Sequence, residues 1–201
     1  TTIKMLTGLL KPSEGRAMLG GFDIQADPVK TKSILGYIPD TPFLYDKLTG
    51  REFMRFVAGL YQLPKETLNG RSEELLDRFE VRHVGDQLIE NYSHGMRQKL
   101  SFASCFLHGP KIVVVDEPWV GLDPKNIRFV KKYLKQQTRE GITVFMSTHS
   151  LGLIEDVADR IGIIHNGKLL HTGTIEEILK LTENPGSLED VFLELTQGEQ
   201  E

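Results

Sequence analysis

The sequence predicts an α/β fold, in which helices cover a parallel sheet and a helical subdomain is inserted into it. Two short apolar runs, 112–115 and 143–147, have the continuous hydrophobicity of strands buried on both faces of such a sheet. Segments with helical periodicity lie between the strand-like runs, which is typical of the α/β class. A helical block from about residue 41 to residue 107 separates an earlier strand from the run at 112–115, and we interpret it as the insertion.

The elements before this block are a helix, a hairpin and a strand. A helical pattern is already under way in residues 1–6, and Pro12 and Gly15 are expected to end it. The elements that follow are hairpin strands 16–19 and 22–24 around Gly20-Gly21, and a strand at 35–38 that Pro39 stops. Because the chain starts inside a helix and lacks an initiating Met, we expect it to be truncated at its N-terminus.

The block itself predicts at least three helices. The first is amphipathic, with apolar residues at i, i+3, i+4 and i+7 from Phe53 onward. A second surrounds Leu75–Phe79, and Ser93 is a good N-cap for a third that we expect to reach Leu107.

Helices and a hairpin are predicted after the two apolar runs. The expected elements are a helix at 126–139 that closes at Gly141, a short helix at 151–158, a hairpin turn at Asn166-Gly167, a capping box of Thr174 with Glu177, and a helix start at Ser187 with Asp190.

Two carboxylates, Asp116 and Glu117, directly follow the run at 112–115. Open α/β sheets bind ligands at the carboxyl ends of their strands, and carboxylates there can bind Mg²⁺ or orient a water molecule. The plain alternative is a core strand followed by a solvated acidic loop.

Composition narrows the function classes. The net charge of −4 argues against nonspecific nucleic-acid binding, and no apolar stretch approaches the roughly 20 residues of a membrane span. The single cysteine, Cys105, excludes an internal disulfide and lies in an apolar helical segment, which favours packing over a nucleophilic role. The histidines have no metal-ligand spacing.

Five motifs in order resemble the nucleotide-binding domain of ABC transporters, the ATPase subunit that drives membrane transport. They are GYIPD at 36–40 for the Q-loop, SHGMRQ at 93–98 for the LSGGQ signature, Asp116-Glu117 for the Walker B aspartate and catalytic glutamate, Gly121-Leu122-Asp123 for the D-loop, and His149 for the switch histidine. The resemblance covers residues 1–201. It implies a P-loop NTPase (RecA-like) sheet core, with the signature carried by the inserted subdomain at about 41–107.

The resemblance also implies roles for these side chains. Asp116 would hold Mg²⁺, Glu117 would polarise the attacking water, and His149 would contact the γ-phosphate of ATP. Ser93 and Gly95, at an anion-attracting helix N-terminus, would bind the γ-phosphate of ATP held by a second nucleotide-binding domain. Taken alone, His149 reads as a surface loop histidine and Ser93 as an ordinary helix cap.

The remaining implied contacts involve residues at the edges of the motifs. Asp123 would bridge the two nucleotide sites across the dimer interface. Asp40 stands where the Q-loop glutamine is usual, and it could approach Mg²⁺ or accept a hydrogen bond from water, so we expect an altered metal dependence. The signature has Tyr92, His94 and Met96 where Leu, Gly and Gln are common.

The 201 residues contain no GxxxxGK[ST] phosphate-binding loop. Alignment of the first helix with the family places Thr1 just after the metal-binding Ser or Thr, at the margin of the nucleotide site. We therefore expect the chain as printed to bind ATP poorly and to hydrolyse it negligibly until the upstream segment is restored.

The resemblance points to the ATP-hydrolysing subunit of a prokaryotic exporter, held on the cytoplasmic face of the cell membrane by a separate ABC-2-type permease. Residues 43–45 are candidates for that contact or, equally, for internal packing, and no nucleic-acid partner is expected. Two alternatives stay open: a non-transport ABC protein that acts on ribosomes or DNA, and a degenerate regulatory cassette that does not hydrolyse ATP.

Overall fold

The computed structural model describes residues 1–182 and 186–197. The chain divides into two compact units, a first unit, Thr1–Ser147, and a second unit, Thr148–Glu201. Among the described residues, no helix has both the length and the apolar character needed to cross a membrane.

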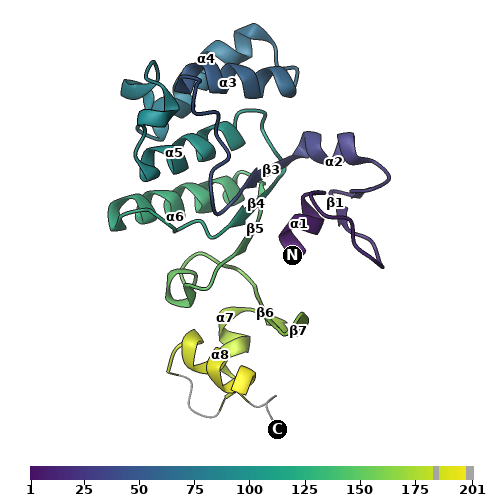
Figure 1. Ribbon diagram of the computed structural model, residues 1–201. Coiled ribbons are helices and arrows are strands. Elements are labelled where there is room, and N and C mark those ends of the chain that lie inside the picture. Colours follow the sequence, from purple (N-terminus) through teal and green to yellow (C-terminus); the bar gives the residue numbers. More distant parts are fainter. Residues whose placement is uncertain (183–185, 198–201) are drawn as a thin grey trace. The chain divides into compact units, whose positions relative to one another are not determined.

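Three parallel strands form the sheet of the first unit (Figure 1). They are β3 (Leu35–Ile38), β4 (Ile112–Asp116) and β5 (Thr143–Ser147), in the order β3-β4-β5. Since all three strands are parallel, the loops that follow them all leave the sheet at the carboxyl ends of the strands, which is where α/β sheets bind ligands.

The central strand β4 is buried on both faces, as its sequence predicts. Its residues Val113, Val114 and Val115 are fully buried. Val114 packs with Ile3 of α1 (Thr2–Leu6) on one face, while α5 (His94–Cys105) and α6 (Pro124–Arg139) cover the other (Figure 1). The parallel, doubly covered sheet confirms the α/β prediction.

Strand β5 differs from the prediction of full burial. Thr143 and Phe145 are exposed, and Phe145 has 43% of its surface accessible. Thr143 and Phe145 project from the same face of β5, and this face is not fully covered in the described part of the chain.

The N-terminal region contains the expected hairpin and one helix that the sequence reading missed. The hairpin pairs β1 (Met18–Leu19) with β2 (Phe22–Asp23), and the missed helix is α2 (Pro28–Ile34). Helix α1 ends at Leu6, earlier than Pro12, because Gly8 adopts a left-handed φ of 71° and Thr7 caps the helix.

Three α-helices and two 3₁₀ turns lie between β3 and β4. They are α3 (Gly50–Leu60), α4 (Lys65–Arg78), η1 (Arg82–Val84), η2 (Ile89–Asn91) and α5 (His94–Cys105). Helix α3 begins with a capping box of Thr49 and Glu52. Helix α5 begins after Ser93, as predicted, and ends at Cys105 rather than Leu107.

Aromatic rings join these helices to α6 (Pro124–Arg139). Tyr133 of α6 contacts Phe79 and Phe106 edge-on, with each pair of ring centroids 4.9 Å apart. Such edge-to-face contacts stabilise a core beyond its buried area.

His108 links the end of this helical region to the sheet. Its Nε2–H donates to the Leu35 carbonyl oxygen at 3.2 Å, and its ring stacks on Tyr61 with centroids 3.7 Å apart. Burial lowers the pKa of His108 to about 4, and Nδ1 has no hydrogen-bond partner in the described part of the chain.

The low pKa of His108 predicts a loss of stability in acid. An unfolded histidine has a pKa of about 6.5, so the unfolded state binds more protons between pH 6.5 and 4. The stabilisation that the neutral His108 side chain contributes to the fold is therefore complete above about pH 6.5 and declines as the pH falls toward 4. We expect the free energy of unfolding to drop by about 1–2 kcal/mol from this group between pH 8 and pH 5, after allowance for its partial exposure.

Denaturant titrations of wild type and His108→Gln at the two pH values measure this drop. The variant should lose most of the pH dependence, whereas exposed His171→Gln should retain it. An equal pH dependence in wild type and His108→Gln would contradict the assignment.

The second unit contains a hairpin and two helices. The hairpin pairs β6 (Ile161–His165) with β7 (Lys168–Gly173), and Asn166 and Gly167 have the positive φ angles that its tight turn requires. Helices α7 (Ile175–Leu179) and α8 (Leu188–Gln197) begin at the predicted caps, Thr174 and Ser187. The expected helix at 151–158 is only a 3₁₀ turn, η3 (Leu151–Leu153).

Candidate functional site

The candidate site begins at Asp116, the last residue of β4. Asp116 pairs in register with Ser147, the last residue of β5, and the Ser147 hydroxyl donates a hydrogen bond to the Asp116 carboxylate. Asp116 is half-buried. Charge-assisted hydrogen bonding of this kind orients a carboxylate.

Glu117 adopts a left-handed backbone conformation, with φ of 49°. Its N–H donates to the Ser147 carbonyl oxygen at 3.0 Å, and its own carbonyl oxygen accepts from Val120 N at 3.3 Å. A residue other than glycine is strained at positive φ, and such strain is concentrated at functional sites. The chain therefore turns sharply at the second acid, whose side chain remains half-buried.

Asp40, predicted as a metal ligand, lies near the same end of the sheet. Burial raises the pKa of the Tyr37 phenol, and the negative charges of Asp116 and Asp40 raise it further. The Asp40 side chain is exposed and accepts a hydrogen bond from Thr41 N at 2.8 Å.

These oxygen donors fit Mg²⁺. In the described ranges, no group of three or more His, Cys, Asp or Glu side chains could hold a metal ion by itself. Mg²⁺ is commonly bound by one or two carboxylates, with phosphates and water completing the octahedron. Asp116, half-buried and oriented by Ser147, suits an ion that arrives with a nucleotide.

The signature residues lie at the start of helix α5. The Ser93 hydroxyl accepts a hydrogen bond from Met96 N at 3.3 Å and caps the helix. Ser93 is exposed and Gly95 is half-buried, so the first turn of α5, with its free N–H groups, is open to an anion.

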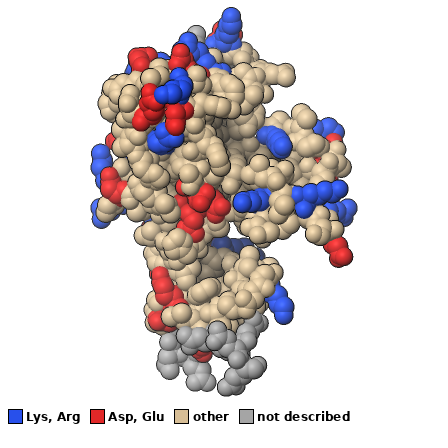
Figure 2. Space-filling view, in the orientation of Figure 1, with Lys and Arg blue, Asp and Glu red and all other residues tan. Residues whose placement is uncertain are grey.

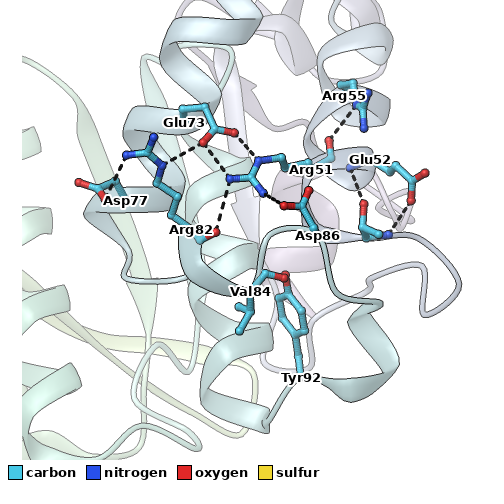
Figure 3. Close-up of polar contacts among 10 residues, drawn as sticks. Arg51, Glu52, Arg55, Glu73, Asp77, Arg82, Val84, Asp86 and Tyr92 are labelled. Atoms are coloured by element: carbon cyan, nitrogen blue, oxygen red, sulfur yellow. Dashed lines mark hydrogen bonds and ion pairs between the residues drawn. The ribbon is translucent and has the colours of Figure 1, made fainter.

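An ion-pair network, drawn in Figure 3, lies directly upstream of this helix. Arg51 of α3 contacts Glu73 of α4 through Nε at 2.6 Å and Nη2 at 3.0 Å, and its Nη1 contacts Asp86 at 2.6 Å. Arg82 adds a second contact to Glu73, at 3.1 Å. Figure 2 shows acidic and basic side chains interspersed over this helical region, while Lys and Arg are more evident over the region of α2 and β1.

Tyr92 connects this network to the signature. Its buried hydroxyl donates to the Val84 carbonyl oxygen at 2.7 Å, in the segment that follows Arg82 (Figure 3). A Cβ placed on Gly50 would lie 2.5 Å from the same hydroxyl, which shows how closely the start of α3 approaches Tyr92. The residue before Ser93 is thus held by α3 and by η1.

A second set of contacts joins α5 to the segment at 43–48. Arg97 of α5 donates to Asp46 at 2.7 Å and to the Ile89 carbonyl oxygen at 3.2 Å. Next to Asp46 lies an aromatic patch, which we define as Phe43, Tyr45 and Phe56. Tyr45 and Phe56 meet edge-on at 5.0 Å, and Phe43 is 85% exposed.

Three predicted site residues have other surroundings. Asp123 is the N-cap of α6, and its two carboxylate oxygens accept from Asn126 N and Nδ2, each at 2.8 Å. Thr1 is exposed and precedes α1, where its side chain makes no cap hydrogen bond. His149 is exposed and belongs to the second unit, two residues after the end of β5.

The structure thus brings Asp116 and Glu117 together with Ser147, which the sequence reading did not select. The signal that could have identified Ser147 is register, because it ends the strand that follows β4 in the chain and the two strands were both predicted. Tyr37, Arg51 and Arg97 were also missed, since each acts through contacts between segments far apart in the sequence.

Comparison with known sequences identifies the family of this chain. Residues 1–120 match the family model described as ABC transporter. The chain is 35% identical over 198 residues to the ABC-type transporter ATP-binding protein EcsA of Bacillus subtilis, which covers 98% of this chain and 80% of EcsA. It is 32% identical over 174 residues to the linearmycin resistance ATP-binding protein LnrL of the same species, covering 87% of this chain and 56% of LnrL.

Structural comparison gives the same family. A solved structure described as the ATP binding subunit of an ABC transporter superposes with a TM-score of 0.89 at 32% identity, covering 96% of this chain and 81% of that one. The chain therefore belongs to the ABC transporter family and has the P-loop NTPase fold of that family's ATP-binding subunits.

Proposed function

We propose that this chain is part of an ATP-hydrolysing subunit that powers export through a separate ABC-2-type permease. The observation that carries the proposal is the pair of acids at the end of β4, with Asp116 oriented by Ser147 and Glu117 set at a strained turn. ATP hydrolysis needs a group that binds the metal and a base for the attacking water. In this proposal Asp116 is the metal-binding group and Glu117 is the base.

In this proposal Glu117 performs the proton transfer. The oxygen of a water molecule forms a bond to the γ-phosphorus while the bond from that phosphorus to the ADP oxygen breaks, and Glu117 takes a proton from the water. Asp116 would hold Mg²⁺, which supplies charge neutralisation on the phosphates when it is bound. His149 would contact the γ-phosphate.

The nucleotide would be enclosed by a second nucleotide-binding domain. The open first turn of α5, with Ser93 and Gly95, would bind the γ-phosphate held by the partner domain. Asp123 would stand at the interface, where its present role as the cap of α6 makes it rigid. The helices between about 41 and 107 would act as the inserted subdomain.

The aromatic patch would contact the permease on the cytoplasmic face of the membrane. Exposed aromatic side chains are the residues most enriched at protein interfaces, and the exposure of Phe43 argues against internal packing. The resistance function in the name of LnrL, a relative at 32% identity, supports export as the direction of transport.

Phosphate release by the full-length subunit, measured in the presence and absence of the co-expressed permease, tests this function. We expect Mg²⁺-dependent release by wild type. The double variant Phe43→Ala, Tyr45→Ala should keep its basal rate within about twofold but lose most co-purification with the permease, because hot-spot aromatics supply most interface affinity.

Val29→Ala is the matched control, because Val29 is 81% exposed on α2, away from the aromatic patch in the sequence. It should co-purify as wild type does. Absence of phosphate release by wild type would refute the ATPase proposal, and unchanged co-purification of the double variant would refute the docking proposal.

A further inference from the structure

His94, the first residue of α5, packs directly on Gly121 of the loop between β4 and α6. A Cβ built on Gly121 would lie 1.8 Å from His94 Cδ2 and 2.1 Å from Nε2, far inside any real contact distance. The imidazole ring therefore occupies the space next to the Gly121 backbone. A second, ordinary contact lies beside it, since a Cβ on Gly95 would be 3.7 Å from the Gly121 carbonyl oxygen.

The loop that receives this contact is tightly wound. Gly121 has a left-handed φ of 74°, as Glu117 does at 49°. Val120 N donates to the Glu117 carbonyl oxygen at 3.3 Å, and Leu122 N donates to the Trp119 carbonyl oxygen at 3.2 Å. Trp119 is only 5% exposed, which anchors the middle of the loop. The two hydrogen-bonded turns, 117–120 and 119–122, overlap and connect Gly121 to Glu117.

The same loop is fixed at its two ends. Glu117 N donates to the Ser147 carbonyl oxygen at one end, and the Asp123 carboxylate caps α6 at the other. Between these ends, the His94 ring is a contact made from a different element, the helix whose first turn is open to an anion.

We propose that His94 is a positioning residue, which packs on Gly121 and holds the Glu117 loop in register with the first turn of α5 within one chain. This inference rests on the proposed ATPase function. In this proposal His94 acts through the packing of its ring on Gly121, and not through its charge or a hydrogen bond to phosphate. The acid of one nucleotide site and the anion-binding helix of the other then move together.

A double-mutant cycle on thermal unfolding tests the contact. Gly121→Ala introduces a methyl group where the ring lies, and it is also strained by positive φ in any background. We expect it to lower the Tm about twice as much in wild type as in the His94→Ala background, because the clash is absent there. Equal Tm decreases in the two backgrounds would overturn the inference.

Steady-state kinetics of the full-length protein test the positioning role. We expect His94→Ala to lower kcat about tenfold with little change in the KM for ATP, since misplacement of a catalytic group acts on turnover. His94→Phe keeps a packed ring without N–H groups and should restore kcat to within about twofold of wild type. Exposed His171→Ala is the control and should have the wild-type kcat.

The outcomes separate this inference from the proposed function. If wild type hydrolyses ATP and His94→Ala has an equal kcat, the positioning role is overturned and the ATPase function stands. If His94→Phe is as slow as His94→Ala, the imidazole acts through its nitrogens, which also overturns it. If wild type releases no phosphate, the proposed function fails, and the inference fails with it.

Discussion

Glu117→Gln is expected to lower ATP hydrolysis by about a hundredfold to a thousandfold, because it removes the proposed base for the attacking water. Glutamine has the same shape and the same backbone preferences as glutamate, so the strained φ of 49° costs the variant no more than it costs wild type. The half-buried position of the side chain also tolerates the neutral amide. The effect should therefore be confined to turnover.

Single-turnover phosphate release and equilibrium binding of ATP together measure this effect. ATP should bind to Glu117→Gln at least as tightly as to wild type, and the nucleotide-bound dimer should persist. Glu66→Gln changes an equivalent group on the exposed first turn of α4 and should have wild-type rates. Turnover that survives in Glu117→Gln would remove this residue from its assigned role.

Arg51→Ala is expected to cause the largest loss of stability, about 2–3 kcal/mol. The Arg51 side chain is 26% exposed and Glu73 is 34% exposed, so their bidentate pair is partly shielded from solvent. Removal of the guanidinium leaves Glu73 without its main partner, and a partly buried carboxylate that loses charge-assisted hydrogen bonds is costly, whereas Asp86 is 85% exposed and contributes less. Partial exposure keeps the expected value below that of a fully buried pair.

Denaturant midpoints of wild type, Arg51→Ala and Arg51→Lys measure the loss. Lysine keeps the charge but not the planar fork, so it should recover about half of the difference. Arg55→Ala, one turn later on α3, is the control, because Arg55 is exposed and its side chain donates to the Arg51 carbonyl oxygen at 3.4 Å rather than to Glu73 or Asp86. Equal midpoints for Arg51→Ala and Arg55→Ala would contradict the role of the network.

The same network gives the loss a pH dependence. Hydrogen bonds and the positive charge from Arg51, with a smaller effect of Arg82, hold the pKa of Glu73 below its ordinary value. A carboxyl group with a lowered folded-state pKa stabilises the fold above its unfolded pKa of about 4.3, and this contribution declines as the pH falls through the lower, folded-state pKa. The difference between wild type and Arg51→Ala should therefore be largest near neutral pH and smaller at pH 3.

Local signals in the sequence predicted much of the fold. The apolar run before Asp116, the turn at Asn166-Gly167 and the capping box at Thr174 each depend on a few neighbouring residues, and each is present. Local signals also misled. The helix expected at 151–158 is a single 3₁₀ turn, and α2 was missed although Asp27 and Pro28 are typical of a helix start.

The candidate site was only partly predictable, because some of its contacts depend on segments that are far apart in the sequence. Asp116 and Glu117 are adjacent in the chain and follow a recognisable strand, so their position could be predicted. The hydrogen bond from Ser147 depends on the register of two strands, and the contact of His94 with Gly121 depends on how a helix packs against a loop. Such contacts are set by tertiary structure, which single-sequence patterns do not specify.

The ion pair between Arg97 and Asp46 has a mechanical consequence for the subunit. Asp46 lies next to the aromatic patch, and Arg97 lies one turn into the helix that begins at Ser93. In the proposed contact with a membrane partner, a load on the patch would reach this helix through the side chains of Arg97 and Asp46, which lie 51 positions apart in the chain. Helix α5 would then receive both this load and, at its first turn, the proposed contact with the nucleotide.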